Sequence, residues 1–214
     1  MTYLELVNDV LVRLREKEVT SVTANSYSKL IGKYVNDIKT QVENAYNWNS
    51  LTATVTVNTV DEVYNYVLTD VGTNFKVMDV INDTDNITMR YVDNKKMNEY
   101  FLEDPLQYGI PTDYNFNGAQ SGDVLVDVYP IPNKVCNLRF NFFIPQAKLS
   151  SGTDVILVPA DVVALGAYAK AIVERGEDQG MQSSEAYQLY RSALADAISI
   201  ESGQFPNELN WYAE

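Results

Sequence analysis

The sequence predicts an α+β fold: an antiparallel bundle of N- and C-terminal helices into which an antiparallel β-sandwich-like domain is inserted. Apolar residues recur every three to four positions near both ends of the chain, whereas in the middle they alternate with polar residues. We therefore expect a helical bundle with a C-terminal tail from residues 1–49 and 150–214, and an inserted β-rich domain from residues 50–149. Neither helical end could bury its apolar stripe alone, so the two ends should pack together.

Two helices are predicted in the first fifty residues. The apolar stripe of the first helix consists of Leu4, Val7, Leu11 and Leu14. The second helix follows a Thr/Ser-rich turn, and its stripe runs from Tyr27 to Ala45. Gly32 lies inside this stripe, where glycine costs about 1 kcal/mol relative to alanine. Either a close approach by a neighbouring helix or a tolerated defect would explain it.

The middle of the chain predicts six or seven short strands separated by turn residues, a spacing typical of an antiparallel sandwich. The strands are expected at residues 51–57, 63–68, 75–81, 87–91, 124–129 and 136–142. One short helix should interrupt them, with Met97, Tyr100 and Phe101 on its inner side and Pro105 after its end.

The last part of the chain predicts two more helices. One begins near Pro159, carries an apolar face rich in small residues and ends at Gly176. The other begins near Ser183, with Ser183 or Ser184 as its N-cap, and stops near Ser202 because a glycine and a proline follow.

The composition is that of a strongly acidic folded protein. The 214 residues include 29 acidic and 16 basic side chains, a formal charge of −13. Because phosphate binding depends on Lys and Arg, a nucleic-acid binder is disfavoured. The sequence has no histidine and a single cysteine, Cys136, which excludes histidine-based nucleophile pairs, thiolate zinc clusters and an intrachain disulfide. We expect no enzyme, no catalytic or metal site and no cofactor.

Targeting signals are also lacking. No apolar run reaches the roughly 18 residues that a membrane span needs, and the opening residues carry no basic-then-apolar secretion signal. We expect a protein made in a cytoplasm that does not insert into a membrane.

The densest run of charge follows the third predicted helix. Its charged residues are Glu174, Arg175, Glu177 and Asp178. Such a cluster could bind a divalent cation or supply paired carboxylates. A helix C-terminus followed by a solvated turn, with a role at a subunit contact, fits the pattern better because Arg175 complements the helix dipole.

The C-terminal tail is unusually apolar for a chain end. Its large apolar residues are Phe205, Leu209, Trp211 and Tyr212. They indicate a docking segment that binds either its own bundle or a partner. Six basic residues in the first third of the chain mix with acids and indicate a solvated or intersubunit face; they are Arg13, Arg15, Lys17, Lys29, Lys33 and Lys39.

Several short motifs occur in a fixed order along the chain. They are residues 6–11 (LVNDVL), 42–48 (VENAYNW), 110–114 (IPTDY), 128–132 (VYPIP), 140–145 (FNFFIP), 158–159 (VP), 165–169 (LGAYA) and 174–178 (ERGED). In this order, the motifs resemble those of the head-to-tail adaptor proteins of short-tailed bacteriophages, the tail-tubular-protein-A-like connector group. The resemblance spans nearly the whole chain and includes no catalytic motif.

The resemblance implies a structural protein of the virion neck, made in the bacterial host. It implies a homo-oligomer, a ring of twelve identical subunits beneath the portal protein, that continues the channel for genomic DNA and offers its outer surface to tail nozzle and fibre proteins. It also implies that the aromatic tail reaches toward the portal. An acidic channel wall would let DNA slide during ejection without sequence-specific binding, because like charges repel.

Two alternatives remain. One is another neck component, a head-completion or stopper protein. The other is a polysaccharide-binding or degrading β-sandwich, since acids are frequent in the strand region and a glycosidase needs only two correctly spaced carboxylates. The 15 tyrosines would then have to line the sugar groove, because there are only two tryptophans.

Overall fold

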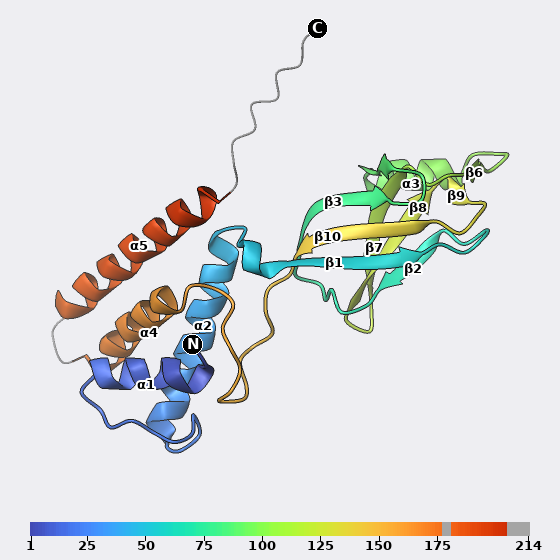
Figure 1. Ribbon diagram of the computed structural model, residues 1–214. Helices are drawn as coiled ribbons and strands as arrows, with labels where there is room; N and C mark the ends of the chain where they lie inside the picture. The colour runs from blue at the N-terminus through green and yellow to red at the C-terminus, as the bar shows by residue number, and fades with distance from the viewer. Residues whose placement is uncertain (177–180, 205–214) are drawn as a thin grey trace, which may run out of the picture. The chain divides into compact units, whose positions relative to one another are not determined.

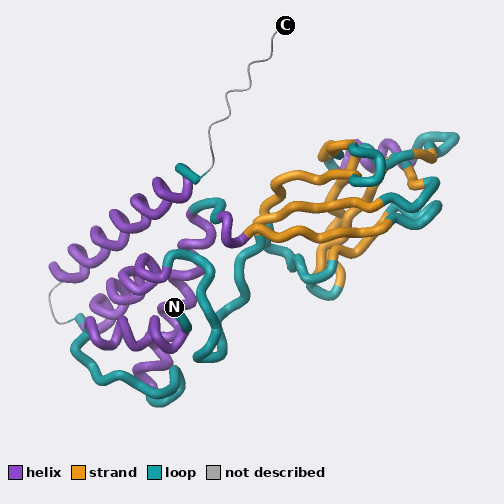
Figure 2. Tube along the Cα trace, in the orientation of Figure 1, coloured by secondary structure: helices purple, strands orange, loops and turns teal. Residues whose placement is uncertain are grey.

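The computed structural model describes residues 1–176 and 181–204, and it divides into two compact units. The helical unit contains residues 1–51 and 146–214, and the strand unit contains residues 52–145. Each unit encloses its own hydrophobic core. Figure 2 shows that, apart from one short helix, the strand unit is built from strands and loops. The α+β fold class predicted from hydrophobic periodicity is confirmed.

Helices from both ends of the chain build the helical unit (Figure 1). They are α1 (Tyr3–Arg13), α2 (Ser26–Ala45), α4 (Ala160–Arg175) and α5 (Met181–Ser202). Their apolar stripes meet in one core, in which Leu6, Ile31 and Val163 are fully buried. The backbone amide of Tyr3 also donates to the carbonyl of Asp154 at 2.8 Å. The two ends of the chain therefore close on each other, as the unpaired apolar stripes require.

Side-chain caps start the first two helices. Thr2 and Glu5 form a capping box on α1, and Asn25 and Ser28 form one on α2. The predicted cap of the last helix is wrong: α5 begins at Met181, so Ser183 and Ser184 lie inside its first turn. The C-terminal stop is as expected, at Ser202.

Gly32 is explained by a close approach. A Cβ atom added there would lie against the hydroxyl of Tyr3 in α1 and 2.8 Å from a methyl group of Val22. A side chain at position 32 would therefore displace both residues, so glycine is required by packing and is not a tolerated defect.

The strand unit is a sandwich of two four-stranded sheets. In the first, the order is β1 (Thr52–Asn58), β10 (Asn137–Phe143), β3 (Lys76–Asn82) and β4 (Ile87–Thr88). In the second, it is β2 (Asn65–Leu68), β8 (Asp123–Tyr129), β7 (Asp113–Gln120) and β5 (Arg90–Tyr91). Leu68, Val126, Phe140 and Leu138 are fully buried in the core formed by the two sheets. Pairing is antiparallel except for β5 with β7 and β6 (Tyr108–Gly109) with β9 (Ile131–Pro132).

Two differences from the predicted strands have a clear cause. The segment 87–91 is not one strand: it pairs with β3 in one sheet as β4 and with β7 in the other as β5, and the buried Met89 lies at the crossing. Strand β7 was not predicted, because its sequence DYNFNGAQ contains asparagines and a glycine that normally indicate a turn. A register shift between Phe116 and Ala119 accommodates them.

The short helix α3 (Asn94–Phe101) lies in the strand unit as predicted, with Met97 buried. Tyr100 stacks on Tyr129 of β8 with ring centroids 4.5 Å apart. In the part of the chain that the structure describes, no helix is long and apolar enough to cross a membrane.

Candidate docking surfaces

The acidic cluster predicted as a contact site lies at the C-terminal end of α4. Glu174 and Arg175 are the last residues of the helix, and Gly176 ends it in a left-handed conformation with φ of 63°. Glu177 and Asp178 lie outside the described residues, as do the four tail candidates, Phe205, Leu209, Trp211 and Tyr212. The structure therefore places only the first two members of the predicted sites.

Arg175 is held by contacts within its own chain. Its Nε atom donates to the Tyr27 hydroxyl at 2.9 Å, and Nη1 donates to the carbonyl of Leu14 at 3.2 Å. Its Nη2 atom forms an ion pair with Glu16, and the guanidinium carbon lies 5.2 Å from the centre of the Tyr27 ring. The hydrogen bond to Tyr27, and then that to Glu16, raise the pKa of Arg175. Arg175 thus ties α4 to the end of α1 and the start of α2.

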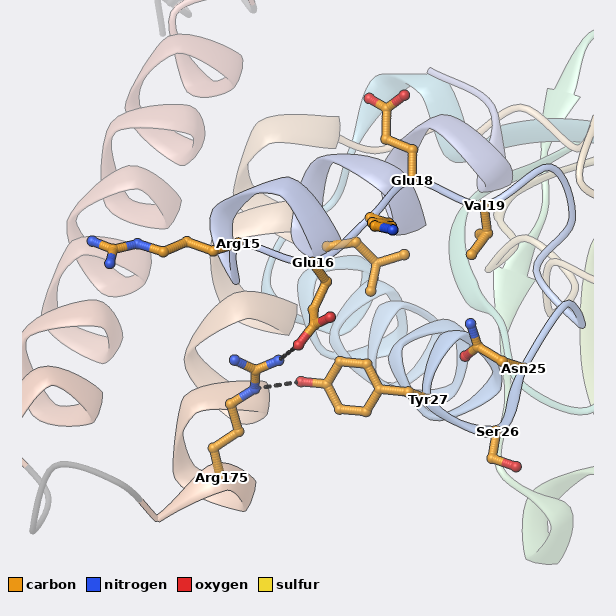
Figure 3. Close-up of a pocket in the computed structure, with 10 residues that line it drawn as sticks. Arg15, Glu16, Glu18, Val19, Asn25, Ser26, Tyr27 and Arg175 are labelled. Carbon is orange, nitrogen blue, oxygen red and sulfur yellow. Dashed lines mark hydrogen bonds and ion pairs between the residues drawn. The ribbon is translucent and has the colours of Figure 1, made fainter.

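A depression of about 750 Å³ opens beside this network, and Figure 3 shows the Glu16, Tyr27 and Arg175 side chains converging on one another. Arg15 points away from this contact (Figure 3). The lining includes three cations and two acids, Arg15, Lys17, Arg175, Glu16 and Glu18. This mixture of charges disfavours a dedicated anion or cation site.

A second depression, of about 570 Å³, lies between α2, α4 and α5. Its lining includes Ile38 and Tyr190, and Gly166 lets these helices approach: a Cβ atom there would lie 2.6 Å from Ile38 and 3.0 Å from Tyr190. Glu174 also lines it and is exposed. Burial, and then the charge of Glu174, raise the pKa of Tyr34, which also lines the depression.

One buried polar arrangement escaped the sequence analysis. Asn36, Lys39 and Glu43 lie on one face of α2, at spacings of three and four residues, and bind the backbone of residues 146–149. Lys39 Nζ donates to the carbonyl of Gln146 at 2.6 Å, and Glu43 accepts from its amide at 3.2 Å. Asn36 accepts from the amide of Leu149 at 2.8 Å and donates to its carbonyl at 3.0 Å. We call these three side chains the α2 clamp.

The α2 clamp corrects one expectation. Lys39 was assigned to a solvated or intersubunit face, but its side chain is 1% exposed and pairs with Glu43 at 2.8 Å. The amphipathic pattern could not show this, because the buried cation serves a backbone segment more than 100 residues away. The polar run of Asn36, Lys39 and Glu43 at helical spacing was the only available signal.

Comparison with known protein families settles the class of protein. The model of the family described as SU10 adaptor protein matches residues 1–209. The chain belongs to the SU10 adaptor protein family. Membership makes it a phage adaptor protein and a component of the virion, and a structural protein rather than an enzyme. No curated protein matches the chain.

The SU10 adaptor match includes both units of the structure, residues 1–51 with 146–209 and residues 52–145. The matched residues therefore contain the helices, the strands and all the short motifs named in the sequence analysis. This match confirms the general assignment as a phage adaptor. The tail-tubular-protein-A-like connector group is a narrower assignment, which the match does not test.

Proposed function

We propose that this SU10 adaptor family member is a head-to-tail adaptor of the tail-tubular-protein-A-like connector type. In this proposal, identical subunits, twelve in number, form a ring beneath the portal protein and extend the DNA channel, and their outer surface docks nozzle and fibre proteins. The observation that carries the proposal is the family match over residues 1–209.

Charge supports the channel role. A chain with a net charge of −13 repels the phosphates of a passing duplex and contributes few of the Lys and Arg contacts that would hold it. Genomic DNA would therefore move through the ring without sequence-specific binding. This predicts that the assembled ring does not retain double-stranded DNA at physiological salt.

We assign portal docking to the apolar tail residues Phe205, Leu209, Trp211 and Tyr212. Large apolar and aromatic side chains supply most of the binding energy at protein interfaces, and these four follow directly after α5, at the end of the helical unit.

We assign the contact between neighbouring subunits to the end of α4, with Glu174, Arg175, Glu177 and Asp178. Glu174 is exposed there. The intrachain bonds of Arg175 to Tyr27 and Glu16 support this assignment, because they hold the end of α4 in one position and so present Glu174 to a neighbour in a defined place.

The proposal is tested by mixing the purified chain with the portal protein of the same phage and measuring mass by light scattering. The expected result is a complex that contains a ring of chains on the portal. Deleting residues 204–214 should abolish this complex and leave the melting temperature unchanged. If the deletion lowers the melting temperature, the tail belongs to its own core; if the intact chain never binds the portal, the adaptor is a different neck component.

A further inference from the structure

Strand β7 contains two consecutive residues, Asn117 and Gly118, that neither neighbouring strand pairs with. On the side of β8, the paired residues pass from Phe116 directly to Ala119, so the two residues between them have no partner in the register. On the other side, β5 pairs only with the first two residues of β7. Asn117 and Gly118 therefore form a bulge, where no ladder of hydrogen bonds fixes the backbone of β7.

The surroundings of this bulge are open. Asn117 and Gly118 are both exposed, and a Cβ atom added at Gly118 would have no other atom within 4 Å. Gly118 has a φ of 89°, a conformation that glycine adopts without steric cost. Among the residues that the structure describes, none forms a hydrogen bond with the side-chain amide of Asn117.

Two other asparagines show how different this position is. Asn115, two residues earlier in β7, is 1% exposed, and its Nδ2 atom donates to the carbonyl of Val92 at 2.5 Å. The side chain of Asn25 caps α2 by accepting from the amide of Ser28 at 2.7 Å. Both side chains are held by the fold. Asn117 is also the only asparagine in the sequence that glycine follows.

This combination permits a reaction within the chain. Once hydroxide has removed its proton, the backbone nitrogen of Gly118 can attack Cγ of Asn117. The new bond joins that nitrogen to Cγ, the bond from Cγ to Nδ2 breaks, and Nδ2 takes a proton from water and leaves as ammonia. The product is a five-membered succinimide ring. A water molecule then adds to one of the two ring carbonyls, and the ring opens to aspartate or isoaspartate.

Geometry decides whether the attack can occur in a folded protein. The side chain of the asparagine and the backbone that follows it must both rotate to bring the nitrogen onto Cγ. A hydrogen-bonded side chain or a paired strand resists this rotation. Glycine in the following position favours it, because it has no Cβ atom in the path and the widest choice of backbone angles.

We propose that Asn117 is a site of spontaneous deamidation in the folded protein. The reaction replaces a neutral amide with a carboxylate that is ionised at neutral pH, so each converted chain gains one negative charge. The isoaspartate product also lengthens the backbone by one methylene group, which a bulge outside the register can absorb without shifting the paired residues. The proposal does not depend on the proposed function.

Incubating the full chain in mildly alkaline water enriched in a heavy oxygen isotope tests the reaction. Fragment ions in a mass spectrum then locate each converted residue. The expected result is aspartate and isoaspartate at position 117, both carrying the heavy isotope, while Asn25 and Asn115 remain amides. The same incubation in urea should convert Asn25 faster than in the native protein, because unfolding releases its side chain. Asn117 should react in both states.

Two alanine variants with matched backbone strain identify the attacking nitrogen. Gly118→Ala places a Cβ atom beside this nitrogen and should slow the conversion by about tenfold. Gly122→Ala is the control: Gly122 has a φ of 97° and an equally open site, but its nitrogen does not follow Asn117. It should leave the rate unchanged.

An Asn117 that is as unreactive as Asn25 in the native protein overturns the proposal. Equal slowing by the two alanine variants also overturns it, because the backbone nitrogen of Gly118 would then not be the nucleophile. The comparison of native and unfolded chain uses the unmodified sequence, so it decides the question even if an alanine variant does not fold.

Discussion

Lys39 Nζ lies 2.8 Å from a carboxylate oxygen of Glu43, and both side chains are 1% exposed. The pair lies one helical turn apart on α2, and both residues also bind the backbone of Gln146. A buried charge without its partner is costly, so the two residues depend on each other. The pair therefore holds a segment that follows the strand unit in sequence against a helix that precedes it.

Lys39→Met should destabilise the protein by about 3–5 kcal/mol, because it leaves the Glu43 carboxylate buried and unpaired. The double variant Lys39→Met with Glu43→Gln should recover about 1–2 kcal/mol, since the remaining group is neutral and still accepts from the amide of Gln146. Urea unfolding measures both.

Arg13→Ala is the matched control. It breaks the Arg13–Asp9 pair at 3.0 Å, whose side chains are 37% and 31% exposed. The expected cost of this break is below about 1 kcal/mol. Equal losses for Lys39→Met and Arg13→Ala would mean that the α2 clamp is solvated.

Gly166→Ala should destabilise the helical unit by about 1–3 kcal/mol, because the new methyl group would overlap Ile38 and Tyr190. Gly152→Ala is the comparison: its Cβ would lie 3.5 Å from Leu4, an ordinary contact. Thermal unfolding followed by circular dichroism distinguishes the two. If Gly166→Ala is silent, α5 does not pack on α4 as closely as described.

Arg15→Gly should stabilise the protein by about 1 kcal/mol. Arg15 has a φ of 59° just after α1, where its amide and that of Glu16 bond back to Val12 and Leu11, and this position favours glycine. Arg13→Gly, two residues earlier at the last position of α1, should instead cost about 1 kcal/mol, because glycine is a poor helix former and the ion pair with Asp9 is lost. Urea unfolding should give changes of opposite sign in the unfolding free energy of the two variants. If both variants lose stability, the Arg15 side chain makes contacts that outweigh the backbone strain.

Asp154 should stabilise the folded protein at neutral pH and lose this contribution in acid. Hydrogen bonds from the backbone amides of Ser150, at 2.7 Å, and Ser151, at 2.8 Å, lower the pKa of its carboxyl in the folded state. Its contribution is therefore complete above the unfolded pKa of about 4 and is lost as the pH falls through the lower folded value. Asp154→Asn should make the unfolding free energy fall less steeply below that pH. An unchanged slope would refute the assignment.

Cys136 should be unreactive in the native protein. Burial, and then the neighbouring Asp85, raise the pKa of its thiol, and its side chain is fully buried. A thiol reagent should label it slowly in buffer and rapidly in denaturant, so the labelling rate reports opening of the strand unit. Rapid labelling in buffer would place Cys136 at a mobile edge.

Hydrophobic periodicity was sufficient for the class of fold and for most elements. The stripes of α1 and α2 and the alternation in β1 and β10 depend on neighbours in sequence, which is why they could be predicted. Strand β7 could not, because its turn-forming residues are tolerated only where β8 supplies the pairing.

The sequence by itself determined that this protein has helices at both ends, strands between them, no histidine chemistry and a strongly acidic surface, since these follow from composition and local spacing. Only the tertiary structure decided three contacts. Arg175 binds Tyr27 and Glu16, and the buried Lys39 donates to the carbonyl of Gln146. The side chain of Tyr3 packs closely against Gly32. Each of these contacts joins residues that are far apart in the chain, and no local pattern carries information about which distant surface a side chain will meet.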